Sequence, residues 1–357
     1  MRNFPAQLID PVFNPDQSYS ALDRFFLSMI RDERDLPFVY LTLKITFIML
    51  PLGLVMYVPG LPIWALVTAA VGYQLVNNFV FKGPFGLMLH CTSHRKWFKK
   101  EYNVFNYYLP WIVGPFFGQT PETYASHHVG MHHKENNLPD DQSSTMSYQR
   151  DSFKSFMAYF LDFLFLGLIK TMGYFRRHNR QSLVTKMARG EVLFFMLCIG
   201  LSFVNFTATL MVFMLPFLIS RFIMMLGNFT QHAFIDPTDP GNHYKNAITC
   251  INHKYNRKCW NDGYHISHHI RPAMHWTQHP EHLQKHRQAY ADNKALVFEG
   301  IDFLVIFIWL MNKRYDKLAS RIVNLGAWDS EEDVITEMKR RTARFQPDQM
   351  AQFAAAS

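Results

Sequence analysis

The sequence has few cysteines and no paired cysteine motif. Its 357 residues include only four, Cys91, Cys198, Cys250 and Cys259, and no two of them are spaced as Cys-x-x-Cys. This argues against a zinc knuckle, a thioredoxin-like site and a disulfide framework, and it fits a reducing, cytosol-facing environment. The first residues, MRNFPAQLIDPVFNPDQ, lack an apolar core, so we expect no cleavable signal peptide.

Charged residues are also scarce. They make up 18% of the chain, against roughly a quarter in an average globular domain, whereas 49% of the residues are hydrophobic. The net charge is +8, but the basic residues do not form a patch with interleaved aromatics and no nucleic-acid motif is present. We therefore expect no nucleic-acid partner. This balance favours contact with anionic membrane lipids or with acidic redox partners.

Four apolar stretches predict membrane spans. Leu36–Val58 and Ile63–Phe81 flank a Pro-Gly turn, and each has about the 20 residues that cross roughly 30 Å of hydrocarbon. A second hairpin is expected from Val192 to about His232, with its turn between Asn205 and Pro216. The alternative for each stretch is a buried helix of a soluble protein.

Three features near these stretches lead to further expectations. Arg221 lies in the fourth span, where a charge is costly in lipid, so we expect it to face the protein interior. The segment from Phe153 to Tyr174 is interrupted by charges and is predicted to lie on the bilayer. Phe303–Met311 is apolar but too short to span.

Charge predicts the topology. Residues 82–189 hold about 14 Lys and Arg, and the two hairpin turns hold none, so the positive-inside rule places this region and both termini in the cytosol. We predict a cytosolic N-terminal segment over residues 1–35, one membrane domain over 36–338, and a flexible tail over 339–357.

Histidines supply the chemical signal. Eight of the 17 fall into three groups that each contain histidines three or four residues apart, a spacing that places side chains on one face of a helix, and a ninth stands alone. The groups are His90 and His94; His128, His132 and His133; His232, which stands alone; and His265, His268 and His269. Nine imidazoles are too many for one metal ion and fit two. Imidazole suits Fe, Zn, Cu and Ni, and no paired Glu-x-x-His motif of a soluble di-iron bundle is present.

The second group also contains His127. A separation of five residues would turn His127 off an α-helical face that His132 occupies, so helical geometry favours His128. His127 is a candidate to orient a metal ligand without binding the metal itself. Asp262, Asp140 and Asp141 are candidates for the same role, because ligating imidazoles usually donate their second N–H to a carboxylate. A solvated loop is the alternative for these acidic residues.

The remaining histidines carry weaker expectations. His253 and His275 flank the last group and are candidates to orient ligands. Those expected to be solvated or near headgroups are His178, His243, His279, His282 and His286.

We call the segment His90–His94 the first histidine box, His127–His133 the second and His265–His269 the third. Three such boxes at the ends of two membrane hairpins resemble the membrane fatty acid desaturase superfamily, which also contains hydroxylases and alkane monooxygenases. The resemblance covers roughly residues 35 to 290. It implies two non-haem irons held by the nine histidines named above, and it matches Asn228 to an asparagine that reaches the metal through water. Two features depart from the common pattern: the longer His-x-x-x-His-His spacing of the second box, similar to that of alkane monooxygenases, and Cys91 where an acidic residue often follows the first histidine.

The resemblance also implies an activity. We expect an O2-dependent desaturase that acts on an acyl-chain lipid, with a hydroxylase or alkane-type monooxygenase as the alternative and a His-rich metal-binding membrane protein as a third hypothesis. No haem-binding His-Pro-Gly-Gly, four-cysteine rubredoxin or GxGxxG motif is present, so electrons must come from an external haem or iron–sulfur carrier.

The expected fold is an all-α integral membrane protein, with four transmembrane helices in two hairpins and a cytosolic helical cap that holds a di-iron site. Its membrane would be the endoplasmic reticulum in a eukaryote or the inner membrane in a bacterium.

Overall fold

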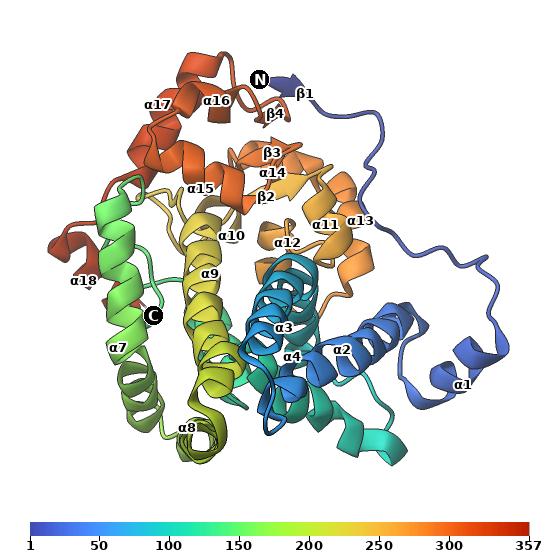
Figure 1. The fold of residues 1–357 in the computed structure, drawn as a ribbon. Helices are drawn as coiled ribbons and strands as arrows, with labels where there is room; N and C mark the ends of the chain where they lie inside the picture. The colour runs from blue at the N-terminus through green and yellow to red at the C-terminus, as the bar shows by residue number, and fades with distance from the viewer. Residues whose placement is uncertain (357) are drawn as a thin grey trace. The chain divides into compact units, whose positions relative to one another are not determined.

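The computed structural model describes residues 1–356, and most of them are helical (Figure 1). The strands are short and form two parallel pairs, β1 (Arg2–Asn3) with β4 (Val323–Asn324), and β2 (Thr249–Ile251) with β3 (Val297–Glu299). The expectation of a helical protein is therefore confirmed.

The chain divides into two compact units. Unit 1 comprises Met1–Val12, His128–His178 and Ile223–Ser357, and unit 2 comprises Phe13–His127 and Asn179–Phe222. Each unit thus gathers segments that are distant in the sequence. Most of the histidine-rich segments belong to unit 1.

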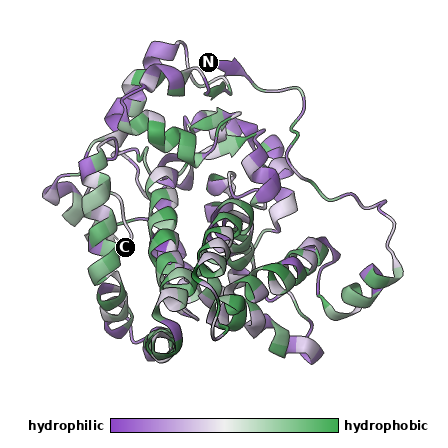
Figure 2. Cartoon of the chain, viewed as in Figure 1, coloured by the Kyte–Doolittle hydropathy of each residue, from purple (hydrophilic) through white to green (hydrophobic). Residues whose placement is uncertain are grey.

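Unit 2 contains the first predicted pair of spans. Its elements in this region are α1 (Ala21–Met29), η1 (Glu33–Asp35), α2 (Leu36–Leu54), η2 (Val55–Tyr57), α3 (Ile63–Leu75), η3 (Val76–Phe81) and α4 (Lys82–His94). The helical stretches Glu33–Tyr57 and Ile63–His94 are both long and apolar enough to cross a membrane, and Figure 2 shows the hydrophobic colour along α2 and α3. The second stretch continues beyond the expected end at Phe81, because the π-helical turn η3 leads directly into α4.

The second predicted pair corresponds to α8 (Gln181–Thr209), η8 (Leu210–Met214) and α9 (Leu215–Gln231), which form one apolar stretch of 51 residues. The backbone leaves the helical region at Asn205, with φ −157° and ψ 102°. The Oδ1 of Asn205 accepts the N–H of Ala208 at 3.0 Å, which caps the next helical turn. The break lies at the N-terminal edge of the range in which the sequence predicted a turn.

Arg221 is enclosed by protein, as expected. One guanidinium nitrogen lies 3.1 Å from the Glu191 carboxylate, and the guanidinium stacks on the Phe217 ring at 4.2 Å. The ion pair and the ring compensate for the desolvation of a charge among apolar helices.

Helix α7 (Phe153–Arg177) in unit 1 includes the segment that the sequence predicted to lie on the bilayer. Its 25 residues are long and apolar enough to cross a membrane. Two of the charges that interrupt it, Asp162 and Lys170, are paired at 2.7 Å. Figure 1 shows α7 beside the C-terminal half of α9, where the ring of Tyr159 packs against Phe229.

Short helices make up the remainder of both units. Unit 2 adds η4 (Lys100–Tyr107), η5 (Leu109–Val113), η6 (Gly114–Phe117) and α5 (Thr123–His127). Unit 1 adds η7 (His128–His132), α6 (His133–Glu135), α10 (His243–Asn246), α11 (Lys254–Lys258), α12 (His265–Ile270), η9 (Trp276–Gln278), α13 (His279–Lys285), α14 (Arg287–Asp292), α15 (Phe303–Met311), α16 (Tyr315–Ala319), α17 (Glu331–Thr342) and α18 (Pro347–Ala356).

The core of unit 1 joins the strands to the C-terminal helices. Phe298 of β3 packs in one buried cluster with Ile306 of α15 and Val334 of α17. The flexible tail expected from residue 339 differs from the structure, because α17 continues to Thr342 and Phe345 is buried beside Met146. Burial of an apolar side chain after the helix end holds this segment on the unit.

Candidate metal centre

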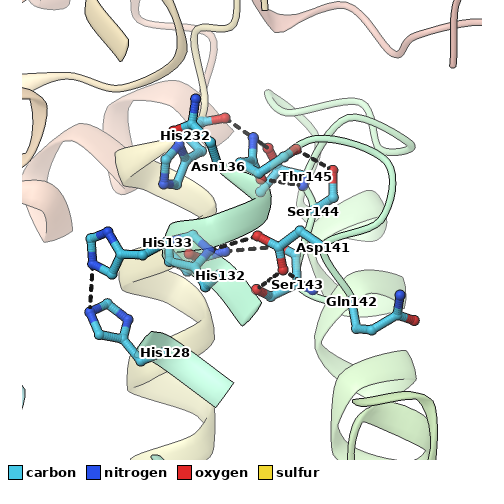
Figure 3. Close-up of polar contacts among 12 residues, drawn as sticks. His128, His132, His133, Asn136, Asp141, Gln142, Ser143, Ser144, Thr145 and His232 are labelled. Atoms are coloured by element: carbon cyan, nitrogen blue, oxygen red, sulfur yellow. Dashed lines mark hydrogen bonds and ion pairs between the residues drawn. The ribbon is translucent and has the colours of Figure 1, made fainter. Parts of the chain in front are cut away.

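The second histidine box adopts a π-helical turn. In this geometry the backbone bonds join residues five apart, so residues i and i+5 come close. The Nε2 atoms of His128 and His133 are 3.0 Å apart, and the rings of His128 and His132 are 5.5 Å apart. The α-helical argument for choosing His128 therefore used the wrong winding, although His128 does face the rest of its box (Figure 3).

The third box lies on α12, and its three histidines are buried. The Nε2 of His269 lies 3.0 Å from the Nε2 of His265, while the Nε2 of His268 lies 2.8 Å from the Nε2 of His133. Adjacent residues His268 and His269 thus point to different partners.

Two histidine groups result within unit 1. The first histidine group consists of His128, His133 and His268, and the second consists of His132, His232, His265 and His269. In each group the candidate ligand atoms lie within 4.8 Å of one another, and all four residues of the second group are buried. His90 and His94 lie on α4 of unit 2, with ring centroids 5.3 Å apart.

Asp141 contacts the Nδ1 of His132, a member of the second histidine group (Figure 3). Its Oδ2 lies 2.7 Å from the Nδ1 of His132, and both side chains are buried. Its Oδ1 accepts the backbone N–H of Ser143 at 2.8 Å and the Ser143 hydroxyl at 2.7 Å. With its Nδ1–H donated to a carboxylate, His132 presents the lone pair of Nε2 to the group. The expected contact between Asp141 and a histidine of the second box is present, and the role of Asp141 at a metal stays a prediction.

Asn246 has the same relation to His232, and sequence reasoning missed it. The Nδ1 of His232 lies 3.0 Å from the carbonyl oxygen and 2.9 Å from the Oδ1 of Asn246. The amide of Asn246 in turn donates to the Asn136 carbonyl at 2.7 Å, and Asn137 donates to the Oδ1 of Asn246 at 3.2 Å. This network fixes the orientation of a fully buried imidazole.

The pair Asn136-Asn137 offered a signal for this network. Both residues have positive φ, 50° and 60°, in a region that asparagine tolerates better than most residues. The turn brings Thr145 back to the site, where its hydroxyl donates to the His232 carbonyl at 2.8 Å (Figure 3). Two consecutive asparagines a few residues after a histidine box therefore indicate a tight reversal.

Two of the three proposed accessory residues, Asp262 and Asn228, form hydrogen bonds with residues other than the histidines. The Oδ2 of Asp262 accepts from the Tyr255 hydroxyl at 2.6 Å and from Gln231 at 3.2 Å. The amide of Asn228 donates to the Tyr159 hydroxyl at 2.7 Å. His127 is the last residue of α5. Their roles at a metal stay predictions.

The expectation that His279 and His282 are solvated is wrong, because both are buried. The Nδ1 of His279 lies 2.8 Å from the Ser267 hydroxyl, and the ring of His282 stacks on His286 at 4.1 Å. These histidines lie on the same face of α13 as the fully buried Leu283, so packing of this short helix carries them inside. His178 is exposed, as expected.

The histidines next to the third box have structural contacts. His253 accepts the N–H of Tyr255 and caps α11, and His275 accepts the N–H of Thr277 and caps η9. His243 is half-buried, and its Nδ1 lies 3.1 Å from the Asn136 side-chain oxygen. His243 therefore belongs to the hydrogen-bond network of Asn136 and Asn246 and is not solvated.

The spacing of the imidazole nitrogens fits metal ions. Two ligand nitrogens at about 2.1 Å from an ion and at right angles to each other lie about 3.0 Å apart. The Nε2 atoms of four pairs within the two groups, His128–His133, His133–His268, His232–His265 and His265–His269, are 2.8 to 3.2 Å apart. Burial, with His132 nearby, lowers the pKa of His232 to about 3, and burial also lowers the pKa of His269. Both imidazoles are therefore neutral near pH 7, which is the form that binds metal.

Replacing Asp141 by alanine should weaken metal binding by about 10- to 100-fold, because His132 loses the acceptor that orients it. Asp141→Asn keeps an acceptor oxygen and should have a smaller effect. Competition with a chelator for Co²⁺ measures the affinity. Asp140→Ala is the matched control and should bind Co²⁺ as the natural chain does. Equal affinities of the Asp141→Ala and Asp140→Ala variants would contradict the role of Asp141.

Comparison with known proteins identifies the family. The family model described as fatty acid desaturase matches residues 64–300, which is more than half of the chain and includes every histidine of the two groups, together with His90 and His94. The comparisons with curated proteins and with solved structures give no match. The match and the two histidine groups agree, and we conclude that the chain belongs to the fatty acid desaturase family.

Proposed function

We propose that the protein is a membrane-bound enzyme that uses two iron ions, O2 and external electrons to introduce a double bond into an acyl chain. One observation carries the proposal: two histidine groups lie side by side in a chain of the desaturase family. His132 and His133 are consecutive yet belong to different groups, and the rings of His133 and His269, again from different groups, are 4.7 Å apart. Such a pair of groups suits two neighbouring ions.

The proposed ligands are the seven histidines of the two groups together with His90 and His94. The last two are added on the strength of the family resemblance and of their spacing by one helical turn on α4. Imidazole suits several metals, so the choice of iron follows the family. Bound iron would supply the oxidising power that an unactivated methylene requires, since it can bind and reduce O2.

The protein residues would hold, orient and shield the ions. Asp141 and Asn246 fix the rings of His132 and His232, and the negative charge of Asp141 offsets part of the charge of an ion. All four imidazoles of the second group are at most 4% exposed, so bulk water is excluded there. A dry site protects a reactive oxidant from side reactions.

The overall reaction balances with an external donor. Two hydrogens leave the acyl chain, two further electrons come from the carrier and two protons from water, and O2 becomes two molecules of water. We propose that the apolar helices hold the site at an integral membrane, on the cytosolic face, where an acyl lipid and the carrier both have access. That membrane would be the endoplasmic reticulum in a eukaryote.

Hydroxylation is the second candidate reaction. The His-x-x-x-His-His spacing from His128 to His133 is similar to that of alkane monooxygenases. Loss of a second hydrogen gives a double bond, whereas return of oxygen to the carbon gives an alcohol.

Expression in a lipid-producing host should yield acyl chains that have lost two hydrogens, detected by mass spectrometry. The matched control is the same host with the His265→Ala variant, which should make none. Detection of acyl chains that have gained an oxygen atom would show that the reaction is hydroxylation and not desaturation. Purified protein that contains iron but supports no O2 consumption would instead favour a metal-binding membrane protein.

A further inference from the structure

An exposed basic surface lies on α11, just before the third histidine box. Lys254, Arg257 and Lys258 are all exposed and lie three or four residues apart, so they share one side of this helix. We call them the α11 basic face. Figure 2 shows α11 in the hydrophilic colour. The opposite side of the helix carries Asn256 and Tyr255, which pack into unit 1.

The α11 basic face is held rigidly against the third box. The amide of Asn256 donates to the Cys250 carbonyl at 2.9 Å, and its Oδ1 accepts the N–H of Gly263 at 3.0 Å. A Cβ at Gly263 would lie 2.3 Å from that Oδ1, so the close approach requires glycine. Gly263 precedes His265 by two residues. The basic side chains therefore project from a platform whose position relative to the second histidine group is fixed.

Aromatic ring contacts connect α11 to the second histidine group. The ring of Tyr255 packs edge-on against Phe303, with centroids 5.8 Å apart, and Phe303 packs edge-on against His265, with centroids 6.4 Å apart. Two ring contacts thus connect the helix that carries the basic face to a histidine of the second group. A protein bound at α11 would lie close to the proposed metals without entering the buried site.

Two acidic residues of this region, Asp262 and Asp302, have partners on other residues. Asp262 accepts the Tyr255 hydroxyl, and the carboxylate of Asp302 lies 3.7 Å from the Nδ1 of His253. Neither of these contacts involves the three basic side chains. The face therefore presents a net positive charge to solvent, and a complementary partner must be acidic.

We propose that the α11 basic face is the docking surface for the external electron donor, a small acidic redox protein. The inference rests on the proposed function, which requires electrons from outside the chain. Each encounter would oxidise one single-electron carrier and reduce the metal pair by one electron, so two encounters serve one turnover. Charge complementarity would steer the carrier to the point where the third box lies directly behind the surface.

Binding of a probe carrier tests this proposal without turnover. We expect oxidised plant-type ferredoxin, an acidic iron–sulfur protein, to bind the detergent-solubilised full chain, with or without metal, as measured by calorimetry. Replacing Lys254, Arg257 and Lys258 together by glutamate should raise Kd by about 10- to 100-fold at low salt. Affinity of the natural chain should also fall as the Debye length decreases from about 30 Å to about 8 Å between 0.01 and 0.15 M salt.

Two controls separate docking from net charge and from folding. A second triple variant, with Lys317, Lys339 and Arg344 replaced by glutamate, carries the same charge change on exposed residues of other elements and should bind ferredoxin as the natural chain does. Cytochrome c, a basic carrier, should bind the α11 variant more tightly than the natural chain. This gain shows that the variant is folded and that charge decides the partner.

Two outcomes would overturn the proposal. One is an unchanged Kd for ferredoxin in the α11 variant; if this variant also has a lower melting temperature in nanodiscs that contain phosphatidylserine, the face is assigned to lipid headgroups. The other is an equal loss of affinity in the second triple variant. Failure of the proposed function is seen separately, as absence of oxidised lipid when reduced methyl viologen supplies the electrons.

Discussion

Replacing His265 by alanine should remove metal from the protein and abolish formation of the desaturated product. Its Nε2 lies 3.2 Å from that of His232 and 3.0 Å from that of His269, so it is central to the second histidine group. Loss of one ligand from a buried site leaves the ion incompletely coordinated. Elemental analysis of purified protein measures the metal, and mass spectrometry of host lipids measures the product. The same loss of activity is expected for each of the other eight proposed ligands.

His286→Ala is the matched control, since this half-exposed histidine belongs to neither group of unit 1 and its variant should retain metal and activity. The pair His127→Ala and His128→Ala tests the choice of ligand in the second box. We expect His128→Ala to be inactive, because His128 lies 3.0 Å from His133. An active His128→Ala variant together with an inactive His127→Ala variant would show that His127 is the ligand.

Replacing Arg150 by alanine should lower the free energy of unfolding by about 3 to 5 kcal/mol, because it removes a fully buried guanidinium and leaves its partners without donors. Arg150 donates to the carbonyl of Ala233, which follows His232, and to the carbonyls of Arg341 and Ala343 at the end of α17. One side chain thus ties the C-terminal helices to the segment that carries a proposed ligand. Chemical unfolding in detergent measures the change.

Arg344→Ala is the control for this prediction, since Arg344 is exposed and its removal should change the stability little. Arg150→Lys retains a charge but donates fewer hydrogen bonds, so its stability should lie between those of the natural chain and the alanine variant. Equal stability of Arg150→Ala and Arg344→Ala would mean that the buried hydrogen bonds contribute nothing net.

The first pair of apolar helices could be predicted from the sequence because its signal is local. An uninterrupted run of apolar residues on each side of Pro59-Gly60 determines both length and position. Other boundaries depend on contacts that no local pattern reveals. In the sequence, Asp162 and Lys170 interrupt the apolar stretch of α7, whereas in the structure they form an ion pair. The end of α17 is held by Arg150, which is distant in the sequence.

Some accessory residues of the site could likewise be predicted from the local sequence, whereas others depend on tertiary contacts. Asp141 could be proposed because it follows the second box closely and carboxylates commonly accept the N–H of a ligating imidazole. Asn246 could not, because its position beside His232 depends on the fold of residues 136–145. His279 and His282 were misjudged because short-helix packing, rather than polarity, decides their burial.

The amino-acid sequence by itself determined the family, the apolar helices and the histidines that are candidates to bind metal, since these depend on residue type and on spacing along the chain. Only the tertiary structure decided that consecutive histidines point to different groups, because a π-helical turn and the approach of α12 set their directions. The asparagine network behind His232 was decided there as well, since its hydrogen bonds join residues that are about a hundred positions apart in the chain.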